Sequence, residues 1–271
     1  MNPLKIGACL APFEIHKHRD WLFEANRDIE LQGFSTYKGL TVELEERIAS
    51  AKEALRGFEG RLGIHGPYEG LDIDNKDPEV RPVITARYLK ALEAAERVGA
   101  RQMVLHSPFN RWYAWNRLNK PNYWETKLAR IHDVMMPVVK AAEAAGITLV
   151  IENILDVDPA SRRAMVDSFD TDAVALSIDT GPAHLARRMS GAPPVDYFVS
   201  DAGDQLRHVH LKDLDGHADR HWAPGEGEIH WQEVFRALSE CTYDPHLVLE
   251  LRRKVDIPEG YKYLKSLGLV E

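Results

Sequence analysis

The sequence has little cysteine, no long apolar run and no excess of positive charge. Its two cysteines, Cys9 and Cys241, fall in a predicted first strand and near the end of a predicted helix, and we interpret both as reduced core thiols. A membrane-spanning helix needs about 18 consecutive apolar residues, and the sequence contains no such run. The amino-terminal M-N-P-L-K-I-G lacks the long apolar segment of a secretion signal. These absences predict a cytoplasmic protein with no membrane contact.

The charge balance and two missing motifs exclude further classes. The chain has 34 Lys and Arg against 42 Asp and Glu, a formal net charge of −8. Phosphate contacts need a basic face, so this balance disfavours a nucleic-acid partner. Neither G-x-G-x-x-G after the first predicted strand nor G-x-x-x-x-G-K is present, which argues against dinucleotide-binding and P-loop folds.

Apolar runs typical of buried strands alternate with helical patterns along the whole chain. Eight such runs in 271 residues give strand–helix units of roughly 34 residues, the size found in a (β/α)8 barrel. The sequence therefore predicts an α/β protein with a single TIM-barrel domain over residues 1–271, and a doubly wound open sheet is the competing arrangement. We expect strands at Leu4–Leu10, Arg27–Phe34, Leu62–Tyr68, Gln102–Phe109, Thr148–Ile154, Val174–Asp179, Arg207–Leu211 and His246–Leu251.

Helical periodicity is clear between most of these runs. After the P-G-E-G turn, for example, the apolar residues Trp231, Val234, Phe235 and Leu238 follow the i, i+3, i+4, i+7 spacing of one helix face. Besides this helix and one that ends at Gly146, we expect helices at Asp20–Asn26, Leu40–Phe58, Pro78–Gly99, Ala160–Phe169 and Tyr261–Leu267, with a loop at Gly191–Pro194.

Imidazoles and carboxylates stand at the carboxyl ends of six of the eight predicted strands. In a barrel these ends converge on one axis, where TIM barrels carry their active sites. Any one of these residues alone is weak evidence, because a lone strand-end His is more often structural. Together they predict a site for a divalent ion such as Mn, Zn, Co or Mg. The residues are His65, His106, Glu152, Asp179, His210 and Glu250.

The motifs around these strand ends resemble the xylose isomerase-like TIM barrel superfamily. They are I-H-G-P-Y, V-L-H-S-P, V-I-E-N, S-I-D-T-G, H-V-H-L-K-D, D-R-H-W-A-P-G-E-G-E-I-H-W and L-V-L-E-L. The resemblance implies a (β/α)8 fold and one divalent metal ion held by Glu152, Asp179, His210 and Glu250. It further implies that Glu152 and Glu250 act as an acid–base pair in a sugar or sugar-phosphate isomerase or epimerase, with proton transfer next to a metal-polarised carbonyl.

The resemblance also implies a pocket for a small sugar or sugar phosphate. Histidines of the matching motifs would line it or bind substrate oxygens, and Arg220 would hold a hydroxyl or a phosphate. Tyr68 and Trp222 are interpreted either as pocket residues or as packing. The expected substrate-binding residues are His65, Tyr68, His106, His184, Asp219, Arg220, His221 and Trp222.

A second branch of the same superfamily, the apurinic endonucleases, provides the alternative function of a metal-dependent phosphodiesterase acting on abasic DNA. Its additional zinc ligands match His65, His106, Asp219 and His221. That branch expects a further His three residues after the strand-six Asp, where this chain has Pro182. The departure and the negative charge both favour the isomerase branch.

Three features have two interpretations each. The aromatic segment from Trp112 to Trp124 is a substrate lid or a contact in a homo-oligomer. Glu30 reaches the barrel interior or its rim, or forms a surface ion pair. Asp213 orients a ligand imidazole or caps its own loop.

Overall fold

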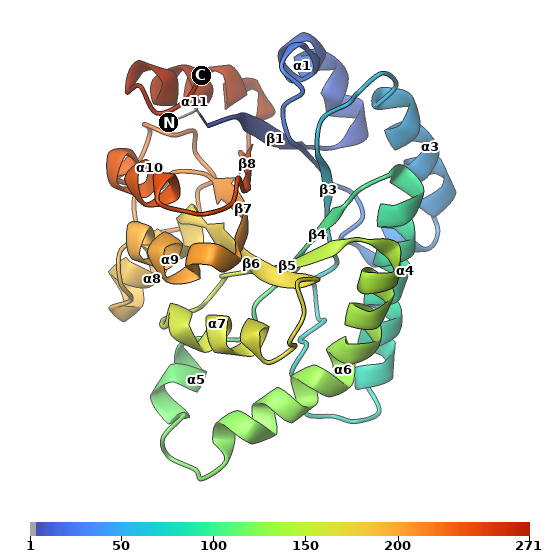
Figure 1. The fold of residues 1–271 in the computed structure, drawn as a ribbon, viewed down its shortest axis with the longest axis vertical. Helices are drawn as coiled ribbons and strands as arrows, with labels where there is room; N and C mark the ends of the chain where they lie inside the picture. Colours follow the sequence, from blue (N-terminus) through green and yellow to red (C-terminus); the bar gives the residue numbers. More distant parts are fainter. Residues whose placement is uncertain (1–3) are drawn as a thin grey trace.

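Eight parallel strands close into a barrel in the computed structural model, which describes residues 4–271 (Figure 1). The strands are β1 Ile6–Leu10, β2 Ile29–Leu31, β3 Leu62–His65, β4 Gln102–His106, β5 Thr148–Glu152, β6 Val174–Asp179, β7 Leu206–Leu211 and β8 His246–Leu249. β1 pairs with β2 on one side and with β8 on the other, so the sheet has no free edge. The predicted TIM barrel is confirmed, and the open-sheet alternative is wrong.

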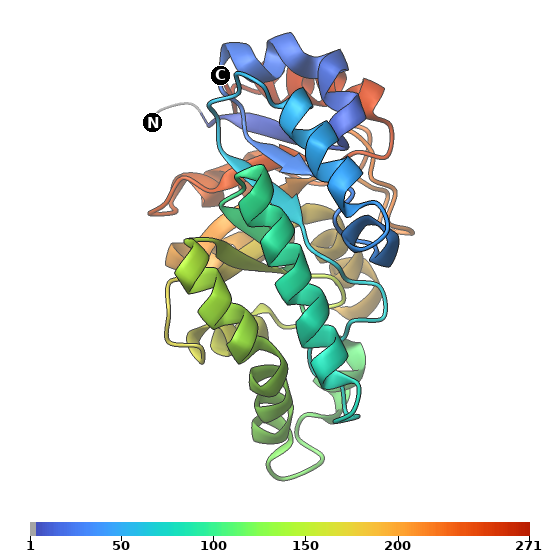
Figure 2. The ribbon, with the colours of Figure 1, turned by 90° about the vertical axis from the view of Figure 1, so that its right-hand side faces the viewer.

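Helices form a ring outside the strands. They are α1 Pro12–Glu24, α2 Tyr37–Leu40, α3 Leu44–Ala54, α4 Arg81–Val98, α5 Arg111–Asn116, α6 Tyr123–Ala145, α7 Pro159–Asp167, α8 Thr180–Ser190, α9 Val195–Ala202, α10 Trp231–Ser239 and α11 Ile257–Ser266. Short 3-10 turns cover Gly203–Gln205 and Lys254–Asp256. The long helices α4 and α6 pack side by side on the outer surface (Figure 2).

Alternation along each strand decides which side chains enter the barrel. Met103 and Leu105 of β4 pack outward against the main core, whereas Val104 packs inside with Val150 and Ala175. Because side chains alternate with a period of two, the residues two positions further along these strands also face inward. Among them are His106 on β4 and Glu152 on β5. The same geometry that buries a small apolar cluster therefore delivers polar groups to the carboxyl-terminal rim.

The helix predictions were right in kind but less accurate in their bounds. The stripe beginning at Trp231 is confirmed, since its four apolar residues are buried in α10. The helix expected at Asp20–Asn26 begins eight residues earlier, at Pro12, whose fixed φ suits the first helical position. The single helix expected over Leu40–Phe58 is two helices, α2 and α3, and sequence periodicity missed α8 and α9 on either side of the correctly predicted loop.

The aromatic segment folds into α5, a loop and the start of α6 (Figure 1), and its residues are absent from the wall of the rim cavity described below. Trp112 and Trp115 are about two-thirds exposed, while Tyr113 is buried. Both cysteines are free thiols, and Cys9 is fully buried. Within residues 4–271, no helix combines the length and apolar character needed to cross a bilayer.

Candidate active site at the carboxyl-terminal rim

A cavity of about 470 Å³ opens at the carboxyl ends of the strands. Its wall contains eight of the residues predicted from the sequence, which come from loops and strands far apart in the chain. Those residues are His65, Tyr68, His106, Glu152, Asp179, Asp219, His221 and Glu250. A ninth, His210, lies directly beneath and is completely buried. The rim thus gathers the polar groups as the strand-end argument predicted.

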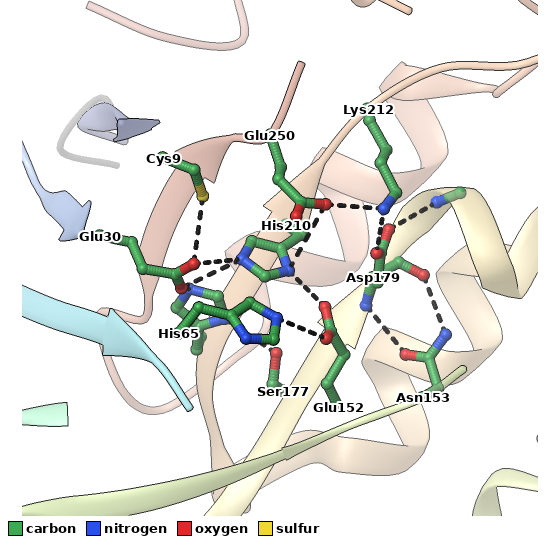
Figure 3. Close-up of polar contacts among 12 residues, drawn as sticks. Cys9, Glu30, His65, Glu152, Asn153, Ser177, Asp179, His210, Lys212 and Glu250 are labelled. Carbon is green, nitrogen blue, oxygen red and sulfur yellow. Dashed lines mark hydrogen bonds and ion pairs between the residues drawn. The ribbon is translucent and has the colours of Figure 1, made fainter. Parts of the chain in front are cut away.

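The four predicted metal ligands converge (Figure 3). Glu152, Asp179 and His210 each offer an atom within 4.8 Å of the others. His210 Nδ1 forms a short hydrogen bond with Glu152 Oε1 and lies 4.0 Å from Glu250 Oε2. Two oxygen donors and one imidazole nitrogen, with a third carboxylate beside them, suit a divalent transition ion. The arrangement therefore fits the divalent ion that the motifs imply.

Lys212 lies among the same carboxylates. Its Nζ is 2.5 Å from Asp179 Oδ2 and donates to Glu250 Oε2 at 2.7 Å. Among the described residues that line the cavity, Lys212 is the one Lys or Arg, against four carboxylates. Burial opposes its charge, but Asp179 and Glu250 outweigh burial and raise the pKa of Lys212 well above its usual value. One ammonium and one imidazolium, that of His210, cannot balance four carboxylates, so the site retains capacity for further positive charge.

Asp179 is held in place from two directions before any ligand binds. Its backbone N–H donates to Asn153 Oδ1 at 2.9 Å, and Asn153 Nδ2 donates back to the Asp179 carbonyl at 2.9 Å. Its Oδ1 accepts from the Gly181 N–H at 3.0 Å and so caps the start of α8. The other oxygen, Oδ2, is the one that faces Lys212. At the end of β6, Asp179 Oδ1 therefore stabilises the start of α8, and Oδ2 remains available to bind a ligand in the cavity.

Glu30 lies on the opposite side of His210, inside the barrel. Its Oε1 and Oε2 are 3.1 and 3.0 Å from His210 Nε2, and the side chain is 2% exposed. The interior interpretation of Glu30 is therefore confirmed, and the surface ion pair is wrong. A sequence signal existed, because a carboxylate between Ile29 and Leu31 interrupts a buried strand, but only the closed barrel shows what it faces.

The protonation preferences of this cluster follow from its pairing. Burial disfavours the charged form of His210, yet Glu152 and Glu30 outweigh burial and raise the pKa of the imidazole well above its usual value. Burial acts against ionised Glu152 too, but His210 and the neighbouring histidines lower the pKa of this carboxyl well below its usual value. For His106, burial outweighs the nearby Glu152 and lowers the pKa of the imidazole to about 4. Without a bound ion, His210 therefore carries positive charge and His106 is neutral at pH 7.

Two further histidines line the wall beside Glu152. His65 Nε2 lies 3.9 Å and His106 Nε2 3.6 Å from Glu152 Oε2, and these three residues form a second group with metal-ligand spacing. The Tyr68 ring stacks on His106 with centroids 4.4 Å apart. Tyr68 therefore belongs to the pocket wall.

On the other wall, His221 lies between two carboxylates. Its Nε2 is 3.0 Å from Asp219 Oδ2, and its Nδ1 is 3.4 Å from Glu250 Oε2. His221 also adopts a φ of 54°, a left-handed conformation that turns the chain there. Asp219 and His221 thus reach the cavity together.

Three of the expected substrate-binding residues do not line this cavity. Arg220 points the other way from its neighbours Asp219 and His221 and pairs with Asp215 at 3.0 Å. Its guanidinium lies over Trp222, 5.5 Å from the ring centroid, so these two side chains pack together outside the wall. His184 is buried one turn into α8, with its Nε2 3.8 Å from Glu228.

Asp213 caps its loop and does not contact His210. Its two carboxylate oxygens accept from three backbone N–H groups, of Leu214, Gly225 and Ile229, and from the indole N–H of Trp231 at 2.9 Å. Gly225 has a φ of 96°, which a side chain would strain. The loop-capping interpretation of Asp213 is therefore confirmed. The P-G-E-G turn packs around this buried carboxylate and thereby fixes the rim loop.

Sequence relatives of known name include sugar-converting enzymes. A D-psicose 3-epimerase of Ruminiclostridium cellulolyticum is 25% identical over 69% of this chain and 61% of its own length. An uncharacterized protein of Methanocaldococcus jannaschii is 24% identical over 77% of this chain and 70% of its own. The chain thus spans less than two thirds of the epimerase that it matches.

Solved structures match over nearly the whole chain. A D-tagatose 3-epimerase-like protein superposes with a TM-score of 0.78 at 22% identity, covering 97% of this chain and 96% of its own. A Thermus thermophilus protein soaked with ZnCl2 superposes with a TM-score of 0.71 at 25% identity, covering 97% and 98%. The sequence model of the family described as xylose isomerase-like TIM barrel matches residues 24–267. The chain therefore belongs to the xylose isomerase-like TIM barrel family.

Proposed function

We propose that the protein is a divalent-metal-dependent isomerase or epimerase of a sugar or sugar phosphate. The observation that carries this proposal is the placement of Glu152 and Glu250, two carboxylates from β5 and the end of β8, in the cavity wall, each with an oxygen beside Nδ1 of the His210 imidazole. Relatives named as sugar epimerases support the substrate class.

Four side chains of the chain define where the ion would bind. Glu152, Asp179, His210 and Glu250 would hold it, as their shared space and excess negative charge support. A bound divalent ion supplies Lewis-acid polarisation of a carbonyl, which makes the adjacent C–H more acidic. The ion is Mn, Zn, Co or Mg, because carboxylates combined with imidazole suit these metals.

Glu152 and Glu250 provide the proton transfer. One carboxylate removes the proton from the carbon beside the carbonyl, and the same or the other carboxylate returns it, on either face of the intermediate. Lys212 holds Glu250 ionised and fixes its orientation through the 2.7 Å contact. His65, Tyr68, His106, Asp219 and His221 present donors and acceptors along the wall, where hydroxyl groups of a sugar would bind.

A second candidate is a phosphodiesterase acting on abasic DNA. The group of His65, His106 and Glu152 supports it, because these side chains offer a place for an additional ion. Two observations favour the isomerase. Pro182 lines the cavity where that branch has a histidine, and His184 is turned toward Glu228 and does not replace it. A net charge of −8 also opposes binding to a polyanion.

Solvent deuterium exchange tests the proposal. The Mn²⁺-loaded protein in D2O is incubated with ketoses, aldoses, inososes and hydroxypyruvate, and NMR follows deuterium entering the carbon next to the carbonyl. Glu152→Gln and Glu250→Gln should each lower the rate by about 10²–10⁴-fold, because each removes an acid–base group. Glu259→Gln, an exposed carboxylate on α11, serves as the matched control and should exchange normally.

Two results would overturn the proposal. One is full exchange activity in both site variants. The other is nicking of an abasic duplex by wild-type protein that converts no sugar, which would favour the phosphodiesterase.

A further inference from the structure

A fully buried polar cluster lies beneath the proposed metal ligands, where TIM barrels usually pack apolar side chains (Figure 3). Its centre is Glu30 on β2, which the proposed chemistry does not use. Cys9 Sγ donates to Glu30 Oε1 at 3.4 Å, and His208 Nε2 lies 3.1 Å from Oε2. His208 in turn contacts Ser177 Oγ through its Nδ1 at 2.8 Å. Glu30 is therefore held on several sides.

Burying this carboxylate is costly for the fold. Among residues 4–271, the groups within ion-pair distance of Glu30 are His208 and His210, with no Lys or Arg. A carboxylate paired only with imidazoles costs free energy that an apolar residue of similar size would not. The cluster therefore needs an explanation beyond stability.

The contact with His210 provides one. Both oxygens of Glu30 lie within 3.1 Å of Nε2, and an ionised carboxylate can only accept, so Nε2 carries the hydrogen. The other nitrogen, Nδ1, faces Glu152 and Glu250, two of the proposed ligands, and without an ion it donates its own hydrogen to Glu152. A metal-binding imidazole needs one nitrogen free of hydrogen. An ion held by Glu152 and Glu250 would take the place of the hydrogen on Nδ1, while Glu30, which is not a proposed ligand, keeps the hydrogen on Nε2.

We propose that Glu30 is a positioning residue that holds His210 in the Nε2–H form, with Nδ1 directed at the divalent ion. This inference rests on the metal-dependent function proposed above. Glu30 itself does not touch the cavity, whose wall does not include it. It acts through His210, so its loss should weaken ion binding more than it weakens the fold.

The test measures metal binding without any sugar. Mn²⁺ and Zn²⁺ are titrated calorimetrically into full-length wild type, Glu30→Leu and Glu30→Gln. Loss of such an outer carboxylate typically weakens metal affinity 10–100-fold, and Glu30→Leu should fall in that range. Glu30→Gln should lose less, because its amide oxygen still accepts from Nε2–H, and it keeps the test valid if the Leu variant fails to fold.

Asp28→Asn is the matched control. Asp28 is a buried carboxylate two residues earlier, 1% exposed, and its partner is Arg61 at the other end of the barrel. This variant should lower the melting temperature but leave the affinity for both ions unchanged. Histidine ¹⁵N NMR of the Zn²⁺-bound protein should show Nε2–H at His210 in wild type.

Three results would overturn the inference: wild-type affinity in both Glu30 variants, a hydrogen on Nδ1 of Zn²⁺-bound His210, or two bound ions of which Glu30→Gln loses one. The last would make Glu30 a ligand. Tight ion binding without sugar turnover would instead overturn the proposed function and leave the role of Glu30 intact. If wild type binds no divalent ion, both proposals are wrong.

Discussion

The two ends of the barrel use the same kinds of charged groups in opposite ways. At the amino-terminal end, Arg61 donates to both oxygens of Asp28 at 2.7 and 2.6 Å, and its Nη1 donates to the Asp244 carbonyl at 2.7 Å. At the carboxyl-terminal end, the single ammonium of Lys212 is shared between several carboxylates, among them Asp179 and Glu250.

The difference separates structure from function. A bidentate Arg–carboxylate pair completes its own charge balance, so the lower end needs nothing from outside. The upper end leaves carboxylates in excess in a buried, shaped cavity, and a divalent ion would complete it. Fully paired carboxylates thus stabilise the amino-terminal end. Incompletely paired carboxylates give the carboxyl-terminal end its capacity to bind a cation.

Replacing Lys212 should have the largest effect on stability, because it removes the ammonium shared by the carboxylates at the carboxyl-terminal end. Lys212→Met leaves Asp179 and Glu250 without their ammonium, and losing one partner of a buried pair costs about 3–5 kcal/mol of unfolding free energy. With a chelator present, urea denaturation should show that loss. Added Mn²⁺ should restore more stability to this variant than to wild type, since it replaces the missing positive charge.

Lys127→Met is the matched control for that experiment. Lys127 is also buried, lies 2.5 Å from Asp74 and donates to the Pro108 carbonyl. Its loss should destabilise the protein, with no extra gain from Mn²⁺. Equal Mn²⁺ effects in the two variants would show that Lys212 and the ion do not share one set of carboxylates.

A smaller effect is expected at the lower end. Arg61→Met leaves the buried carboxylate of Asp28 unpaired and should cost about 2 kcal/mol, because Arg61 is itself partly exposed. Sugar turnover and metal affinity should stay at wild-type values, as measured by the exchange and titration assays above. A loss of metal affinity comparable to that of Glu30→Leu would contradict the separation between the two ends.

The smallest effect concerns pH. Burial, with Arg61 and His208 nearby, lowers the pKa of His246 to about 3 in the folded protein. The unfolded chain binds this proton near pH 6.5, so the contribution is present above that pH and is lost as the pH falls toward 3. His246→Phe should remove this pH-dependent contribution. Between pH 6 and pH 5, the unfolding free energy from urea denaturation should therefore fall by about 1 kcal/mol less in the variant than in wild type. Parallel stability curves for the two proteins would be the contrary result.

The sequence was sufficient to predict the barrel and the convergence of its strand ends. Apolar runs at regular spacing imply eight parallel strands, and parallel strands bring their carboxyl ends to one rim, so the convergence of Glu152, Asp179, His210 and Glu250 with His65 and His106 was expected without coordinates. The choice of the first four as metal ligands came from the family resemblance and stays a prediction. Rim loops were harder, because neighbouring side chains in a loop point in different directions. Asp219 and His221 enter the cavity, whereas Arg220 between them turns toward Asp215.

The interior contacts could not be predicted for another reason. Glu30 and His210 are 180 residues apart, and only the tilt and closure of the barrel bring β2 opposite β7 at this depth. Lys212 was visible as a neighbour of His210 in sequence. Its bridging of Asp179 and Glu250 depends on how the end of β7 lies between β6 and β8.

The most direct test of the central claim is a crystal structure of the Mn²⁺-loaded protein, with the ion located by its anomalous scattering. We predict one ion per chain, bound by Glu152, Asp179, His210 Nδ1 and Glu250. An ion bound elsewhere, or a cavity that stays free of metal at saturating Mn²⁺ with Lys212 still joining Asp179 and Glu250, would contradict the account.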